Sequence, residues 1–169
     1  MKNKIALIGM MGAGKSTIAD ELKKELADFE LVDVDKKIEN ETGQTITQIF
    51  IENSEEYFRK LERDCIAEIF KPDDKKLIIA LGGGAFENEE NQKLILENST
   101  VFYLYASASD IYERIKTQLN RPLLKNNKNV ENIANIINKR KFNYEKAHHT
   151  IDTDGKNFYN IVTEILEKI

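Results

Sequence analysis

The sequence predicts an α/β domain of three layers, in which helices flank a central, mainly five-stranded parallel sheet. Short runs rich in Val and Ile alternate along the chain with longer segments of helical spacing. Four of these runs are almost continuously apolar, which is typical of strands buried on both faces of a parallel sheet, and a fifth is weaker. This alternation favours parallel strands joined by right-handed helical crossovers.

The expected elements follow one another in a regular order. The expected strands are residues 5–8, 31–34, 77–81, 101–105 and the weaker 150–151. The expected helices each carry one apolar face and contain residues 18–26, 58–69, 111–119 and 161–169. Ser54 stands where it would cap the second of these helices, with Glu55 and Glu56 in the first turn, where acidic side chains are favourable.

The composition is that of one globular domain of residues 1–169, because 41% of the residues are hydrophobic and 32% are charged. A net charge of −4 disfavours a non-specific nucleic-acid binder. The single cysteine, Cys65, excludes an internal disulfide, and no apolar run approaches the ~18 residues of a membrane span. We therefore expect a cytoplasmic protein with no nucleic-acid or membrane partner, and we expect it to be a monomer.

A phosphate-binding loop is the strongest signal in the chain. Residues 9–16 read Gly-Met-Met-Gly-Ala-Gly-Lys-Ser, which matches G-x-x-x-x-G-K-[ST] between an expected strand and an expected helix. Gly9 and Gly14 allow a tight turn that brings backbone N–H groups to phosphate oxygens, and Lys15 supplies a positive charge to them. The Ser16 hydroxyl is a candidate Mg²⁺ ligand. The sequence therefore predicts a nucleoside triphosphate site, and the glycine spacing argues against a dinucleotide fold.

Two carboxylates close the second expected strand. Asp33 and Asp35 flank Val34 at the carboxyl end of that strand, where ligands of open α/β sheets bind. Alternate residues of a strand share a face, so both carboxylates are expected to point to one site. Asp33 would hold Mg²⁺ through water, and Asp35 would accept a hydrogen bond from a substrate hydroxyl. The alternative is that Asp35 caps a helix that starts near Lys36.

A glycine triplet and a few arginines indicate a second substrate. Gly82, Gly83 and Gly84 follow the third expected strand, and three consecutive glycines indicate a backbone that a ligand approaches closely, with a plain flexible turn as the alternative. For Arg59 the alternative to a binding role is a surface ion pair with Glu62, three residues later. Together with the phosphate loop, the arginines suggest charges arranged for phosphoryl transfer.

The order of the motifs resembles the shikimate kinase family over essentially the whole chain. The motifs are the phosphate loop, Asp33-Val34-Asp35, Phe58-Arg59-Lys60-Leu61-Glu62, Gly82-Gly83-Gly84, Arg121-Pro122-Leu123-Leu124 and Lys139-Arg140. The resemblance implies a P-loop kinase fold with a mobile lid at about 112–129 and a substrate-binding helical segment at about 35–63. It implies ATP-dependent phosphorylation of the 3-hydroxyl of shikimate, with Mg²⁺ as cofactor and with ATP, ADP and shikimate as ligands.

The same resemblance implies a role for each matching residue. The nucleotide would contact Gly12, Ala13, Gly14, Lys15, Ser16, Thr17, Arg114 and Arg121. Shikimate would contact Asp35, Phe50, Phe58, Arg59, Gly82, Gly83, Gly84 and Arg140, with its carboxylate held by the two arginines. Ser16 would bind Mg²⁺ directly and Asp33 would bind it through water. The catalytic residues would be Lys15, Asp35 and Arg121.

Two features depart from the family pattern, and two other functions are alternatives. Ala80-Leu81 supplies no hydroxyl before the glycine triplet, and Phe142 stands where many members have Pro, which leaves the local helix geometry open. One alternative is a kinase of another small polyol acid, such as gluconate, or of a nucleotide. The other is a nucleotide-dependent regulatory switch, whose usual Asn-Lys-x-Asp motif is incomplete here because Val130 follows Asn127-Lys128-Asn129.

Overall fold

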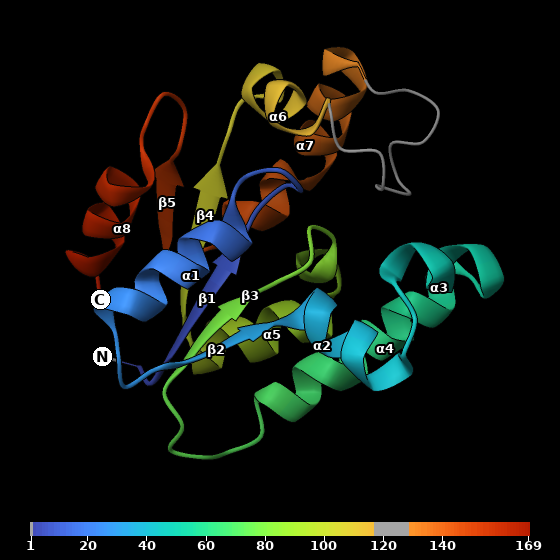
Figure 1. The fold of residues 1–169 in the computed structure, drawn as a ribbon, viewed down its shortest axis with the longest axis horizontal. Helices are drawn as coiled ribbons and strands as arrows, with labels where there is room; N and C mark the ends of the chain where they lie inside the picture. Colours follow the sequence, from blue (N-terminus) through green and yellow to red (C-terminus); the bar gives the residue numbers. More distant parts are fainter. Residues whose placement is uncertain (1, 117–128) are drawn as a thin grey trace.

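The computed structural model describes residues 2–116 and 129–169, and it arranges them as a sheet between layers of helices (Figure 1). The strands are β1 (Lys4–Ile8), β2 (Glu30–Asp33), β3 (Leu77–Ala80), β4 (Thr100–Tyr105) and β5 (His149–Asp152). Within the described residues they form one five-stranded parallel sheet in the order β2-β3-β1-β4-β5. The predicted α/β class and the parallel sheet are therefore confirmed.

Helices connect successive strands and cover the sheet. They are α1 (Lys15–Glu25), α2 (Val34–Thr42), α3 (Ile46–Glu52), α4 (Glu55–Ile69), α5 (Glu89–Asn98), α6 (Ala108–Ile115), α7 (Val130–Tyr144) and α8 (Phe158–Leu166), with a short 3₁₀ turn, η1 (Ala85–Glu87). Ser54 caps α4 as predicted, because its side chain accepts a hydrogen bond from the Tyr57 N–H. α7 continues through Phe142, so the residue that departs from the family pattern does not interrupt the helix. No helix of the described ranges has the length and apolar character to cross a membrane.

The core lies on both faces of the sheet, and β1 contributes to each. Ile5 and Leu7 pack toward α1, α6 and α8, whereas Ala6 and Ile8 pack toward α2, α4 and α5. This division follows from the strand period of two, since successive side chains leave opposite faces. β1 is buried at every position, as predicted for a central strand of a parallel sheet.

The prediction of two-sided burial is wrong for the second strand. Among the described strands, β2 lies at the edge of the sheet and pairs with β3 alone, so Glu30 is exposed and the other three residues are half-buried. The strand also ends one residue earlier than expected, because Val34 is the first residue of α2. The early end matters for the site, because it changes the local structure around Asp33 and Asp35.

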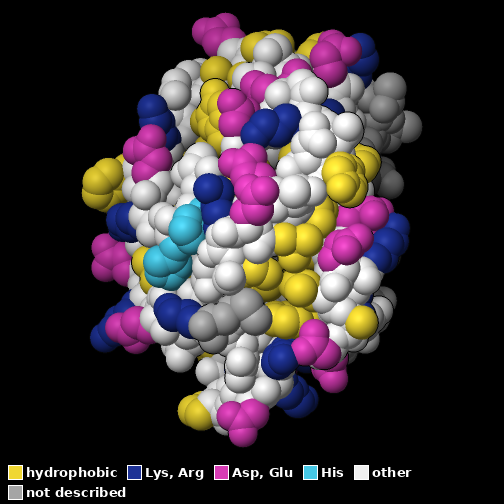
Figure 2. All heavy atoms as spheres, turned by 90° about the vertical axis from the view of Figure 1, so that its left-hand side faces the viewer, with side chains coloured by type: hydrophobic (Ala, Val, Ile, Leu, Met, Phe, Trp, Pro, Cys, Tyr) yellow, Lys and Arg dark blue, Asp and Glu magenta, His cyan; other side chains and the backbone are white. Residues whose placement is uncertain are grey.

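The opposite edge of the sheet carries the two histidines. Nδ1 of His148 accepts a hydrogen bond of 2.9 Å from the Val101 N–H, and the His149 ring stacks on Phe102 with centroids 5.1 Å apart. Figure 2 shows the histidine side chains on this face with basic side chains on either side. Lys2 is one of the positive charges that act on His148.

The sheet register brings three loops to one end of the molecule. Asp33 at the end of β2 pairs with Ala80 of β3, and Ala80 pairs in turn with Leu7 of β1. The carboxyl ends of these strands therefore lie at the same level, where ligands of open α/β sheets bind. The phosphate loop, the two aspartates and the glycine triplet leave the sheet together at this end.

Candidate active site

The phosphate loop connects β1 to α1 through a backbone that favours glycine. Gly14 precedes the helix with φ of 92°, in the left-handed region, and Gly9 has φ of 143°. A Cβ atom at Gly9 would lie 2.5 Å from the Leu104 carbonyl oxygen, so no side chain fits there. Within residues 2–116 and 129–169 no side chain caps α1, which leaves the N–H groups of its first turn available to an anion.

Lys15 spans the loop in this structure. Its Nζ donates to the carbonyl oxygens of Gly9 at 2.9 Å and Met10 at 3.0 Å. The ammonium group therefore lies inside the curve of the backbone, close to the N–H groups that begin α1. A triphosphate bound by those amides would lie within reach of the same charge.

Ser16 and Asp33 meet at the edge of the loop. The Ser16 hydroxyl donates to Oδ2 of Asp33 at 2.7 Å, and Oδ1 of Asp33 accepts a hydrogen bond of 3.2 Å from the Lys36 N–H at the start of α2. Asp33 is therefore the residue that caps α2. The predicted alternative, in which Asp35 caps this helix, is wrong because the strand has already ended at Asp33.

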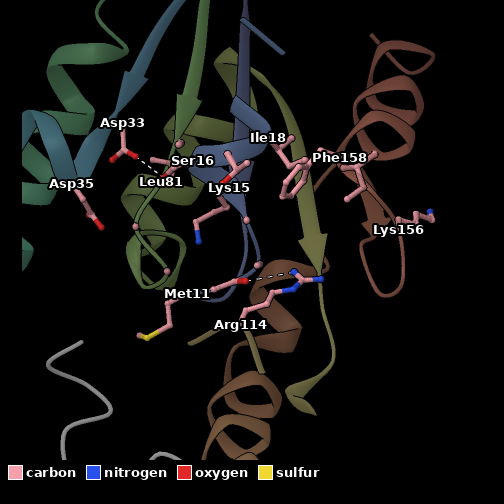
Figure 3. Close-up of a pocket in the computed structure, with 18 residues that line it drawn as sticks. Met11, Lys15, Ser16, Ile18, Asp33, Asp35, Leu81, Arg114, Lys156 and Phe158 are labelled. Atoms are coloured by element: carbon pink, nitrogen blue, oxygen red, sulfur yellow. Dashed lines mark hydrogen bonds between the residues drawn. The ribbon is translucent and has the colours of Figure 1, made fainter. Parts of the chain in front are cut away.

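Asp35 reaches the site from the first turn of α2 and not from a strand. The argument that Asp33 and Asp35 share a strand face is therefore wrong, although both line the same cavity. Figure 3 shows both aspartates on one side of this cavity and the Lys15 side chain extending into it. The turn from β2 into α2 brings both carboxylates to one site, as strand alternation was expected to do.

This cavity has a volume of about 420 Å³ and lies over the phosphate loop. Its far wall holds Arg114 of α6, which donates to Asp110 at 3.1 Å and to the Thr153 carbonyl at 3.3 Å. Arg114 also reaches the Gly12 carbonyl at 3.5 Å, so it is tied to the phosphate loop (Figure 3). The structure thus brings the predicted Arg114 to the nucleotide side of the site.

Two residues of this wall were missed from sequence. Lys156 and Phe158 line the cavity in the segment that follows β5. Phe158 begins α8 with 52% of its surface exposed, next to the cavity (Figure 3). An aromatic residue three positions after Gly155 was the available signal, but Phe158 precedes the expected apolar face at 161–169.

The glycine triplet separates this cavity from a second one of about 490 Å³. Gly82 and Gly83 line the first cavity and Gly84 lines the second. A Cβ atom at Gly82 would lie 2.7 Å from Oε1 of Glu62 and 3.0 Å from Oδ1 of Asp35, and one at Gly84 would lie 2.5 Å from Nη2 of Arg59. The triplet therefore provides space for charged side chains, which supports the predicted close approach over a plain flexible turn.

Arg59 enters the second cavity from α4, held by two carboxylates. Its Nη1 donates to Oε2 of Glu62 at 2.7 Å, and its Nη2 donates to Glu55 at 3.3 Å. The guanidinium lies 5.2 Å from the ring centroid of Phe58, which packs on Phe50 with centroids 5.0 Å apart. Of the two predicted phenylalanines, Phe58 therefore packs against Arg59 and Phe50 packs against Phe58.

Glu62 is buried, so the alternative of a surface ion pair is wrong for this residue. Its side chain is 2% exposed, and its Oε1 has no hydrogen-bond partner among the residues that the structure describes. Burial raises the pKa of the Glu62 carboxyl, and the neighbouring Asp35 acts in the same direction while Arg59 opposes both. Sequence reasoning missed Glu62 as a site residue because an acid three residues from an arginine on a helix is usually solvated.

Arg140 enters the same cavity from α7, on the other side of the glycine triplet. Its Nη1 donates to the Gly83 carbonyl at 2.8 Å. Across residues 2–116 and 129–169, Arg140 forms no ion pair with a carboxylate, in contrast to Arg59. The two arginines therefore present unequal free charge to an anionic ligand.

The residues at the phosphate loop fit a magnesium ion that shares its ligands with a nucleotide. Ser16 and Asp33 offer a hydroxyl and a carboxylate, the hard oxygen ligands that Mg²⁺ prefers. In the part of the chain that the structure describes, no group of three or more His, Cys, Asp or Glu residues is placed to hold a metal. This is the pattern of a site in which phosphate and water supply most ligands, rather than of an all-protein cage.

One predicted residue and most of one segment lie outside the described residues. Arg121 and positions 117–128 of the expected lid belong to this part of the chain. Their assignment stays a prediction from sequence.

Comparison with known proteins identifies close relatives over nearly the whole length. A family model described as shikimate kinase matches residues 11–169. A shikimate kinase from Persephonella marina is 42% identical over 169 residues, covering 100% of this chain and 99% of the relative. A shikimate kinase from Bacillus anthracis is 41% identical over 165 residues, covering 98% and 97% respectively. The solved structure of shikimate kinase from Acinetobacter baumannii in complex with shikimate matches with a TM-score of 0.91 and 32% identity, covering 98% of this chain and 91% of that one.

Proposed function

This chain belongs to the shikimate kinase family, and we propose that it transfers the γ-phosphoryl group of ATP to the 3-hydroxyl of shikimate. One observation carries the proposal beyond family membership. The glycine triplet borders both cavities, with the phosphate loop on one side and two arginines on the other. A phosphate donor and a carboxylate-bearing acceptor would therefore meet across one short segment of backbone.

In this proposal the nucleotide binds along the phosphate loop. The N–H groups of residues 12–17 surround the β- and γ-phosphates, and Lys15 places its charge beside them. Arg114 borders the nucleoside portion at the far wall of the cavity. Ser16 and Asp33 would hold Mg²⁺, the first directly and the second through water. When bound, the ion would supply positive charge that offsets the charge of the phosphate oxygens.

The acceptor lies between α2, α4, α7 and the glycine triplet. Arg59 and Arg140 bind its carboxylate, because a guanidinium donates two parallel hydrogen bonds to such a group. Asp35 lines the first cavity beside Gly82, and it accepts a hydrogen bond from the reacting hydroxyl. Phe50 and Phe58 form the apolar support beneath Arg59.

The reaction needs positioning and charge more than covalent chemistry. The acceptor oxygen forms a bond to the γ-phosphorus as the bond from that phosphorus to the bridging oxygen breaks, which releases ADP. The hydroxyl proton passes to Asp35 and from there to water. Lys15 offsets the charge on the transferring group, a term that is typically large in phosphoryl transfer.

We further propose that residues 1–169 act as one monomeric domain in the cytoplasm, and that residues 35–63 form its acceptor-binding segment. The location of Asp35 and Arg59 at the two cavities supports this boundary. Arg121 and the lid at about 112–129 stay predictions.

Side-by-side assays of acceptors test the proposed function. Purified protein with ATP and Mg²⁺ is offered shikimate, gluconate or a nucleoside monophosphate, and ADP release is measured with each. Of the three acceptors, we expect only shikimate to cause ADP release. Mass spectrometry and NMR should identify the product as phosphorylated shikimate. Faster turnover with gluconate or a nucleotide would assign the protein to another kinase class. ATP hydrolysis that does not respond to any acceptor would support a regulatory switch.

A further inference from the structure

A buried tyrosine of α7 shares the Gly83 carbonyl with Arg140. The Tyr144 hydroxyl donates to this oxygen at 2.5 Å, and Nη1 of Arg140 donates to it at 2.8 Å. The two residues are four apart in one helix, so their side chains lie on the same face. A carbonyl oxygen has two lone pairs, and both are engaged here. α7 thus fixes the middle of the glycine triplet at a single atom.

The sheet determines where the Tyr144 hydroxyl lies. Its ring is 1% exposed and stacks on Tyr103 of β4, with centroids 4.9 Å apart and planes 27° apart. β4 pairs with β1, which is next to β3, the strand that leads into the triplet. Burial raises the pKa of Tyr144 to about 12, so the hydroxyl keeps its proton and stays a donor at neutral pH.

The two hydrogen-bond donors differ in their access to a ligand. Tyr144 is enclosed, whereas Arg140 lines the second cavity and, by the proposed function, binds the carboxylate of the acceptor. We propose that Tyr144 is a positioning residue, whose hydroxyl holds the glycine triplet in place while the guanidinium of Arg140 turns to the acceptor. This inference rests on the proposed function, because that function supplies the carboxylate.

Loss of the Tyr144 hydroxyl would leave Arg140 to donate to both the Gly83 carbonyl oxygen and the carboxylate of the substrate. Without it, the Gly83 carbonyl and the bound carboxylate compete for the guanidinium of Arg140. The triplet also borders Arg59, since a Cβ atom at Gly84 would lie 2.5 Å from Nη2 of that residue. A displaced triplet would therefore disturb both arginines that hold the acceptor.

The test is Tyr144→Phe, which removes one oxygen and keeps the stacked ring. We expect the KM for shikimate to rise about three- to tenfold, the range for one hydrogen bond between neutral groups. The KM for ATP should stay within about twofold, because the Tyr144 hydroxyl donates to the triplet and not to the phosphate loop. The matched control is Tyr103→Phe, since the Tyr103 hydroxyl makes no hydrogen bond to any residue of the described ranges. That variant should keep both KM values.

A readout without catalysis accompanies the kinetics. The rise in Tm on adding shikimate should be smaller in Tyr144→Phe than in the wild type, because weaker binding stabilises the folded state less. Wild-type protein that does not phosphorylate shikimate would contradict the proposed function itself. If the wild type is active, an unchanged KM for shikimate in Tyr144→Phe would overturn the positioning role. Equal rises in both KM values, or the same change in Tyr103→Phe, would indicate general loosening and would also overturn it.

Discussion

The two halves of the site are built in different ways. The phosphate half consists of consecutive residues, 9–16, held in shape by their own backbone and by Lys15. The acceptor half gathers Asp35, Arg59 and Arg140 from three helices around the glycine triplet, and a hydrogen bond from Arg140 to the Gly83 carbonyl joins residues 57 positions apart. A local site is specified by a short motif, whereas an assembled site depends on packing. Substitutions in the two halves should therefore change different kinetic parameters.

The largest effect is expected in the phosphate half. Lys15→Met removes the charge beside the transferring group and should lower kcat by at least about 10³-fold, the scale seen when a cation is removed from such a group. ADP release at saturating substrates measures this. Lys23→Met, on the same helix, is the control, because the Lys23 ammonium only donates to the Ala27 carbonyl at the surface. A kcat within tenfold of the wild type would contradict the role of Lys15.

The boundary between the halves is tested at Asp35. Asp35→Asn keeps the shape and removes the charge, and we expect kcat to fall by about 10²-fold because the proton acceptor is lost. Binding of ADP, measured by calorimetry, should be unchanged. Asp74→Asn, at an exposed position, serves as the control. A parallel loss of ADP affinity would place Asp35 in the phosphate half.

The acceptor half is tested by comparing its two arginines. Arg140→Gln should raise the KM for shikimate by roughly 10- to 100-fold, the range for hydrogen bonds to a charged group, with little change for ATP. Arg59→Gln should raise it less, because Glu55 and Glu62 already offset part of the Arg59 charge. Lys141→Gln is the control, since Lys141 lies on the same helix as Arg140 and pairs with Glu145 at the surface. A larger effect at Arg59 than at Arg140 would contradict this ranking.

The smallest effect is expected outside both halves, at His148. Burial lowers the pKa of His148, and Nδ1 must stay unprotonated to accept the Val101 N–H. As pH falls through about 6.5, the unfolded chain takes up a proton more readily than the folded one, so folding stability falls. The decrease in Tm from pH 8 to pH 5.5 should be smaller in His148→Gln than in the wild type, by up to about 2 °C. The His149→Gln variant is the comparison, and identical pH profiles for the wild type and His148→Gln would refute the assignment.

The sequence was sufficient where structure is local. The phosphate loop, the Ser54 cap and the parallel strands depend on neighbouring residues and on the apolar pattern, and the structure confirms each. The residues of the acceptor half were predicted from the resemblance to a family, but no local pattern predicted how these side chains are arranged in space.

The features that were missed depend on contacts between distant segments. Glu62 is buried because the glycine triplet packs against α4, and its spacing from Arg59 indicates only an exposed pair. The bond from Tyr144 to Gly83 joins residues 61 positions apart. The error at Asp35 has another cause, since the apolar run does not show that Asp33 ends the strand by capping α2.

Asp33 belongs to both halves at once. One of its oxygens accepts the Ser16 hydroxyl at the phosphate loop, and the other accepts the backbone N–H that begins α2, the helix that carries Asp35. Asp33 therefore ties the first turn of α1 to the first turn of α2 through a single carboxylate. In the proposed reaction, this side chain would connect the loop that holds the phosphate donor with the helix that carries Asp35.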